Sequence, residues 1–244
     1  MNKRLYFIYR FLTIASLACG LILNLINTYS PSTLMAYYTM QSNLLCLLVF
    51  IFIPLMKKNH KNLYYVGKGA ITIAILLTAT VYLVALLPND YSMCTTSTVS
   101  GVITSKAIGN LLVHVISPIC VTLDYFLFDK KGNFKLYYPW LWLIIPLMYV
   151  GFVYIFHAKG KYFYGIGGSR NFAYFFLDYQ KIGIKGVVGW IIRISIFVIL
   201  LGYLLFYIDK KLAKKRWKTQ QILLCLSTLG KKGSVLFFPS FLYK

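Results

Sequence analysis

Long apolar segments separated by short polar ones run through most of the chain. A helix needs about 20 apolar residues to cross the roughly 30 Å hydrocarbon core of a bilayer. Six segments approach that length, roughly at 5–27, 33–56, 70–88, 105–128, 139–157 and 187–209. The pattern predicts an all-α protein with a six-helix transmembrane bundle over residues 1–218, followed by a short interfacial or disordered tail over 219–244.

Basic residues gather on alternate sides of these segments. Fifteen lie on the side that holds the N-terminus, namely Lys3, Arg4, Lys57, Lys58, Lys61, Lys68, Lys130, Lys131, Lys135, Lys210, Lys211, Lys214, Lys215, Arg216 and Lys218. Six lie on the other side, namely Lys106, Lys159, Lys161, Arg170, Lys181 and Lys185. Positive charge favours the cytoplasmic side of a membrane. We therefore expect a multi-pass protein of the cell membrane with both termini in the cytoplasm.

The composition agrees with this class, because 59% of the residues are hydrophobic and only 13% are charged. A net charge of +21 would suit a nucleic-acid partner, but the charges lie in short runs between apolar segments. Membrane topology explains such runs, so no nucleic acid is expected. Five scattered cysteines and three scattered histidines predict neither a disulfide framework nor a metal site, and no cofactor is expected.

Polar side chains inside the apolar segments are informative, because each is costly in a bilayer unless it is paired or faces an internal cavity. In segment 33–56, Thr39 and Asn43 are four residues apart and share one helical face. Ser42 lies at the edge of that face, and Gln41 lies nearby. The spacing predicts a polar stripe that faces the interior of the bundle.

Segment 105–128 has a similar stripe, since Asn110, His114 and Asp124 fall on one helical face. Pro118 follows the histidine by four residues and cannot donate the amide hydrogen bond that the His114 carbonyl would receive. We therefore expect this helix to kink or open near the histidine.

Thr39 and His114 are predicted to lie at similar depth, roughly 12 and 15 Å from the outer ends of their helices at 1.5 Å per residue. A threonine hydroxyl needs a nearby base to act as a nucleophile, and an imidazole is suited to that role. Asn43, Asn110 or Gln41 would then donate hydrogen bonds to the oxyanion. The alternative is structural, because such polar side chains commonly hold membrane helices together.

Three charged residues inside the membrane segments need partners. Arg10 and Asp124 are both expected near the cytoplasmic boundary, where a structural ion pair would satisfy both charges. Arg193 is expected close to the level of Thr39. It is predicted to extend outward, to pair with Asp178, or to bind the anionic head of a ligand.

The segment 157–186 is aromatic, glycine-bearing and basic. Its Tyr and Phe residues suit the headgroup region of a membrane. We expect it to lie along the outer leaflet and to cover the entrance above Thr39 and His114. His157 at its start and His60 in a lysine-rich loop are expected to be solvated.

Four stretches carry a family resemblance: "YYTMQSNLL", "LLVHVISPICVTLDYFLF", "YYPWLWLIIPLMY" and "FFLDYQKIGIKGVVG". Over most of residues 1–216 the chain resembles a bacterial six-span family, the Pr-six-Pr membrane proteins. That family is more distantly similar to the androgen-induced and androgen-dependent membrane proteins of animals, which are threonine hydrolases of fatty acid esters of hydroxy fatty acids. The resemblance implies Thr39 as the nucleophile and His114 as the base.

Two functions are therefore expected from the sequence. The first is an intramembrane hydrolase that cleaves a fatty acyl ester with Thr39 and His114. The second is a non-enzymatic protein that binds or moves a lipid or small amphiphile, with the same polar stripe as the binding site and Arg193 at the ligand's head.

Overall fold

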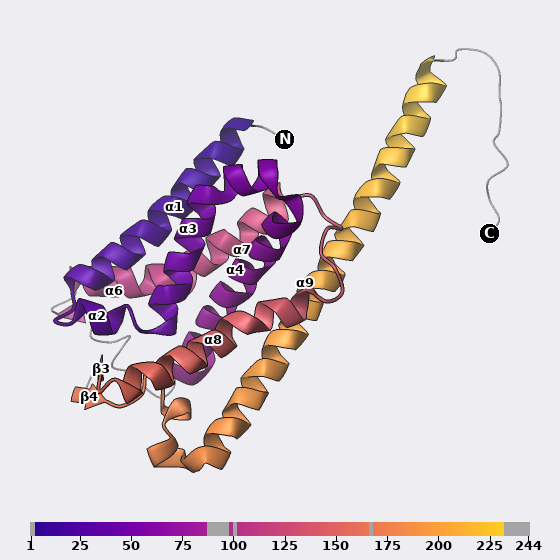
Figure 1. Cartoon of the computed structure of the whole chain (residues 1–244). Helices are drawn as coiled ribbons and strands as arrows, with labels where there is room; N and C mark the ends of the chain where they lie inside the picture. Colours follow the sequence, from indigo (N-terminus) through magenta and orange to yellow (C-terminus); the bar gives the residue numbers. More distant parts are fainter. Residues whose placement is uncertain (1–2, 87–97, 100–101, 166–167, 232–244) are drawn as a thin grey trace.

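The computed structural model describes residues 3–86, 98–99, 102–165 and 168–231, which are mostly helical (Figure 1). The α-helices are α1 (Lys3–Ile26), α2 (Pro31–Leu34), α3 (Tyr38–Asn59), α4 (Lys61–Val81), α6 (Ser105–Leu111), α7 (Ser117–Phe128), α8 (Tyr138–Ala158) and α9 (Tyr179–Lys231). Two π-helical turns, η1 (Tyr82–Leu86) and η2 (Leu112–Ile116), and one 3₁₀ turn, η3 (Phe175–Leu177), accompany them. Two short antiparallel hairpins pair β1 (Thr98–Val99) with β2 (Val102–Ile103) and β3 (Phe163–Gly165) with β4 (Gly168–Arg170).

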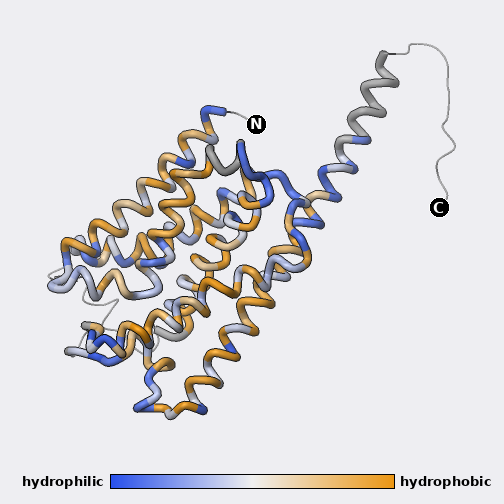
Figure 2. The backbone as a smooth tube through the Cα atoms, in the orientation of Figure 1, coloured by the Kyte–Doolittle hydropathy of each residue, from blue (hydrophilic) through white to orange (hydrophobic). Residues whose placement is uncertain are grey.

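Five helical segments are long and apolar enough to cross a membrane, which confirms the all-α class and indicates a membrane protein. They are Lys3–Ile26, Lys61–Val84, Ser105–Phe128, Tyr138–Ala158 and Tyr179–Thr219. Hydrophobic residues predominate along these helices, apart from the basic part of α9 (Figure 2). Large apolar side chains on their outer faces, such as Phe11 and Met148 at 70% exposure each, are suited to contact lipid.

The segment predicted over 33–56 is not one continuous helix. It divides into α2 and α3, because the amides of Ala36 and Tyr37 bond to carbonyls only three residues back and so form tight turns. The apolar part of α3, Tyr38–Ile53, is shorter than the five candidate spans. Thr39 therefore lies in the first turn of α3, and the predicted depth of about 12 Å inside a longer helix is wrong.

Helix α4 is the central helix and contacts α3, α7, α8 and α9. Small residues permit this packing: a Cβ atom on Gly69 would come within 2.1 Å of the Trp142 ring of α8. The sequence predicted that this helix begins near residue 70, but it begins at Lys61. Lys68 thus lies inside a helix and is fully buried, not solvated in a loop.

The helix predicted over 105–128 is present and opens where Pro118 predicts. It runs as α6, η2 and α7, and the Ser117 amide bonds to the Leu112 carbonyl five residues back. Thr104 caps its start by accepting a hydrogen bond from the Ala107 amide at 3.3 Å. His114 lies within the π-helical turn, a geometry that is frequent at functional sites.

Helix α9 spans 53 residues and is far longer than the predicted 187–209 segment. Gly183, with φ of +68°, breaks its first turns. After the apolar part come Lys, Ala, Leu, Arg and Gln residues, which are strong helix formers, so α9 continues past the bundle (Figure 1). The predicted tail is accordingly helical as far as Lys231, and residues 232–244 lie outside the described residues.

Candidate functional site

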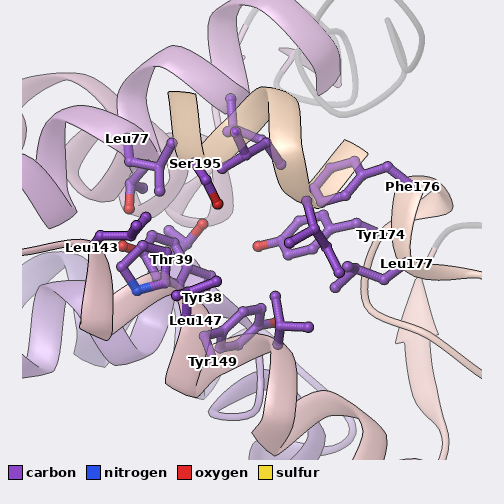
Figure 3. Close-up of a pocket in the computed structure, with 16 residues that line it drawn as sticks. Tyr38, Thr39, Leu77, Leu143, Leu147, Tyr149, Tyr174, Phe176, Leu177 and Ser195 are labelled. Carbon is purple, nitrogen blue, oxygen red and sulfur yellow. The ribbon is translucent and has the colours of Figure 1, made fainter. Parts of the chain in front are cut away.

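An apolar cavity lies among α3, α4, α8, α9 and the segment that precedes α9 (Figure 3). It holds about 640 Å³ of space free of protein atoms, part of it open to the surroundings. The wall is formed by Tyr38, Thr39, Leu77, Thr78, Val81, Leu143, Pro146, Leu147, Tyr149, Val150, Tyr174, Phe176, Leu177, Ile191, Ile194 and Ser195. Most of these side chains are aliphatic or aromatic, as in sites that bind small apolar ligands.

A few hydroxyl groups interrupt the apolar wall. In Figure 3 the oxygen atoms of Ser195 and Tyr174 point into the same part of the cavity, beside Thr39. Burial raises the pKa of Tyr174. The tyrosine hydroxyl therefore stays protonated near neutral pH and can donate to a ligand oxygen.

The local structure around Thr39 ties α3 to its neighbours. The Ser42 hydroxyl donates to the Thr39 carbonyl at 3.0 Å and bonds the Thr78 hydroxyl of α4 at 2.7 Å. The Asn43 amide donates to the Thr39 carbonyl at 2.8 Å and to the Val113 carbonyl of η2 at 3.1 Å. Ser42 and Asn43 thus hold the Thr39 turn by backbone and interhelical bonds, which is the structural role that the sequence left open.

His114 lies in η2, the turn that Asn43 contacts through the Val113 carbonyl. Its ring stacks on Tyr82, with centroids 4.0 Å apart and planes 12° from parallel. Asn110 donates to the Tyr82 hydroxyl at 3.3 Å. The described cavity wall contains Thr39 but not His114, and Asn43 joins the two neighbourhoods only through backbone carbonyls. Of the predicted catalytic and substrate-binding residues, the described wall of this cavity contains Thr39.

Two further candidate residues lie away from the cavity wall. Gln41 is half-buried in the first turn of α3 and is absent from the described lining. Arg193 is exposed, and its guanidinium lies 5.4 Å from the Trp190 ring centroid. Its neighbours Ile194 and Ser195 line the cavity instead.

Asp178 does not pair with Arg193 in the described ion pairs. It is buried and accepts the backbone amides of Gln180 at 3.1 Å and Lys181 at 3.3 Å. The Lys181 ammonium lies 3.8 Å from the same carboxylate. Asp178 therefore caps the start of α9, where a negative charge is favourable.

The ion pair expected between Arg10 and Asp124 is present, with Nε and Nη2 of the arginine at 3.1 and 3.3 Å from the carboxylate oxygens. Lys68 also binds Asp124, and it lies 3.9 Å from Asp129. The Tyr64 hydroxyl donates to Asp129. The sequence analysis did not place Lys68 in this cluster, because it began the helix near residue 70 and left Lys68 outside it.

The segment between α8 and α9 covers one side of the cavity. Its residues Tyr174, Phe176 and Leu177 form part of the wall. The segment thus approaches Thr39, as predicted, although His114 is not part of that wall. His157 was expected to be solvated, but it is half-buried, 4.6 Å from the Phe172 ring. His60 is exposed.

Tyr174 and Ser195 were missed as candidate site residues. Ser195 is a polar residue within the apolar run of α9, and that interruption is the signal that could have indicated it. Tyr174 lies in an aromatic loop whose sequence does not specify where the loop folds back. Within the described residues, no cluster of three or more His, Cys or Asp side chains is arranged to hold a metal ion.

The chain was compared with protein-family models, with curated proteins and with solved structures, and none of them matches. Its class therefore comes from its own structure. Five helices of membrane-spanning length indicate a helical membrane protein, and an apolar cavity lies between its helices.

Proposed function

We propose that this chain is a six-span protein of the cell membrane, with both termini in the cytoplasm, that binds or moves an amphiphile with an acyl chain. The supporting observation is the cavity, whose wall is apolar except for hydroxyl groups that include Thr39, Tyr174 and Ser195. Apolar walls favour the hydrocarbon chain of such a ligand, and the hydroxyl groups of the wall can orient its ester or hydroxyl group by hydrogen bonds.

Contacts between distant segments support the six-span topology. With α3 as the sixth span, the basic stretches after α3, after α7 and in α9 lie at the same end as the N-terminus. Arg10 near the start of α1 meets Asp124 near the end of α7. Tyr125 donates to Asp209, which directly precedes the basic part of α9. The positive-inside rule assigns this end to the cytoplasm.

The test is equilibrium binding of a fluorescent long-chain fatty acyl ester to the purified chain in detergent. Ser195→Trp fills part of the cavity, whereas Ile196→Trp adds the same side chain at the next residue, which is exposed. We expect Ser195→Trp to weaken binding by at least about tenfold, which corresponds to roughly 1.4 kcal/mol. Ile196→Trp should bind like the wild type. Equal binding by all three proteins would refute a ligand site in this cavity.

A second candidate function is hydrolysis of a fatty acyl ester. It is favoured by the position of Thr39 on the cavity wall, where its hydroxyl would attack the ester carbonyl carbon. The alcohol would leave, and water would then release the acid from the acylated threonine. His114 would have to reach the Thr39 hydroxyl to accept its proton, and the resemblance to the six-span threonine hydrolases implies this pair.

Covalent labelling by a fluorophosphonate in membranes distinguishes the two functions. Labelling that is lost in Thr39→Ala and in His114→Ala, but kept in the control Thr80→Ala, would support the hydrolase. Thr80 lies in α4, and its hydroxyl bonds the Leu76 carbonyl at 2.9 Å. A folded wild type that takes no label would exclude the threonine nucleophile and leave the binding function.

A further inference from the structure

Asp209 fixes the loop 129–137 against α9. Its side chain is fully buried and accepts the backbone amides of Gly132 at 2.9 Å and Phe134 at 3.2 Å. The Tyr125 hydroxyl donates to the same carboxylate. One buried anion thus bonds two amides of the loop and the end of α7, which gives the loop a defined position relative to α9.

The next turn of α9 strengthens this contact. Lys210 donates to the Gly132 carbonyl at 2.9 Å. Gly132 has a φ of +87°, and a Cβ atom at this position would lie 3.0 Å from the Ala213 side chain. The loop and the first basic turns of α9 therefore form one continuous surface.

This surface carries exposed lysines from both segments, which we call the platform lysines: Lys130 and Lys135 of the loop, and Lys211 and Lys214 of α9. Lys215, Arg216 and Lys218 continue the charge along α9 and are also exposed. The described ion pairs involve none of the platform lysines. Figure 2 shows the hydrophilic loop beside the hydrophilic part of α9.

Exposed aromatic and apolar side chains adjoin the platform lysines. Leu136, Tyr137 and Trp140 are 60, 53 and 56% exposed. The indole of Trp140 donates to the Tyr203 hydroxyl at 3.0 Å. Tryptophan and tyrosine residues of this kind are typical of the level of lipid headgroups. The platform lysines therefore lie next to the zone in which the phosphates of a bilayer are found.

We propose that the platform lysines bind the phosphate of an anionic phospholipid in the membrane that holds the protein. The cations supply charge complementarity, and the neighbouring Leu136, Tyr137 and Trp140 suit the upper acyl chain region. Nucleic acid also carries phosphate, but it would not use exposed apolar residues at membrane depth. This site is separate from the apolar cavity and does not depend on the ligand that the cavity binds.

The test measures thermal unfolding of the purified full-length chain in detergent while phosphatidylglycerol or phosphatidylcholine is added. The platform variant carries Lys→Gln at Lys130, Lys135, Lys211 and Lys214. A matched control carries the same change at four exposed lysines of the opposite end, Lys106, Lys159, Lys161 and Lys185. Each variant must unfold at the wild-type temperature in phosphatidylcholine, which shows that its fold is intact. If the platform variant does not, two double variants replace it: one changes Lys130 and Lys135 of the loop, and the other changes Lys211 and Lys214 of α9.

We expect phosphatidylglycerol to raise the unfolding temperature of the wild type and of the control, but not that of the platform variant. The apparent affinity should fall roughly fivefold for each platform lysine removed and should weaken with salt. Equal responses of the platform and control variants would overturn the proposal. The same stabilisation by inorganic phosphate alone would assign the surface to a free anion and would also overturn it.

Discussion

Asp124 is the anion that two buried cations share. It is fully buried, lies 3.1 Å from the Nε atom of Arg10 in an ion pair, and also pairs with Lys68. Asp129 lies 3.9 Å from Lys68 and completes a cluster of two cations and two anions, whose formal charges cancel. Asp124→Asn keeps the size of the side chain but leaves one positive charge without compensation in a buried position.

Breaking a buried ion pair in this way costs about 3–5 kcal/mol. We therefore expect Asp124→Asn to lower the free energy of unfolding by about that amount. The double variant Asp124→Asn/Lys68→Met removes one charge of each sign and should recover most of the loss. Lys61→Met, at an exposed position of the same helix as Lys68, is the control and should change stability by less than about 0.5 kcal/mol.

Equilibrium unfolding in mixed micelles, followed by circular dichroism, measures these differences. The double-variant cycle isolates the coupling between Asp124 and Lys68. A double variant whose loss equals the sum of the two single losses would show that the ion pair is not what stabilises this end of the bundle.

Three further predictions concern stability and its dependence on pH. Gly69→Ala should destabilise the chain by about 1–3 kcal/mol, because a Cβ atom there would lie 2.1 Å from the Trp142 ring. The control Gly151→Ala, with nothing within 4 Å of its Cβ position, should show no loss in thermal unfolding, since alanine is the better helix former. Asn43→Leu removes the amide that joins α3 to η2, so the same assay should show a loss of about 1–3 kcal/mol, and an unchanged midpoint would contradict this role. Burial lowers the pKa of Lys131 from its ordinary value of 10.5 to about 8. Between these two pH values the unfolded chain binds more protons than the folded chain, so the free energy of unfolding should rise with pH. Lys131→Met should remove this part of the rise when the free energy of unfolding is measured from pH 7 to 10.

The sequence predicted the helices well where one apolar run ends in polar residues. Residues 105–128 form the expected helix, and Pro118 marked the place where it opens. The division between α2 and α3 could not be predicted, because the turn before Tyr38 contains neither glycine nor proline. The apolar run of α9 predicts only part of its length, because the basic residues that follow are not apolar but are good helix formers.

The site was harder to predict than the helices. Spacing places Thr39 and Asn43 on one helical face, but it does not specify which helix that face contacts. Thr39 therefore lies on a cavity wall with Tyr174 and Ser195, whereas His114 stacks on Tyr82. Such partners come from separate segments, and only the folded chain brings them together.

Photo-crosslinking tests the central claim, an acyl chain in the cavity, most directly. A fatty acyl ester with a photoreactive group in the middle of its chain is irradiated with the protein in membranes, and the modified residues are mapped by mass spectrometry. We predict adducts on cavity residues from different helices, such as Leu77, Leu147 and Ile194, and a loss of these adducts in Ser195→Trp. Adducts confined to outward-facing residues such as Met148 and Leu200, unchanged by Ser195→Trp, would contradict a binding site inside the bundle.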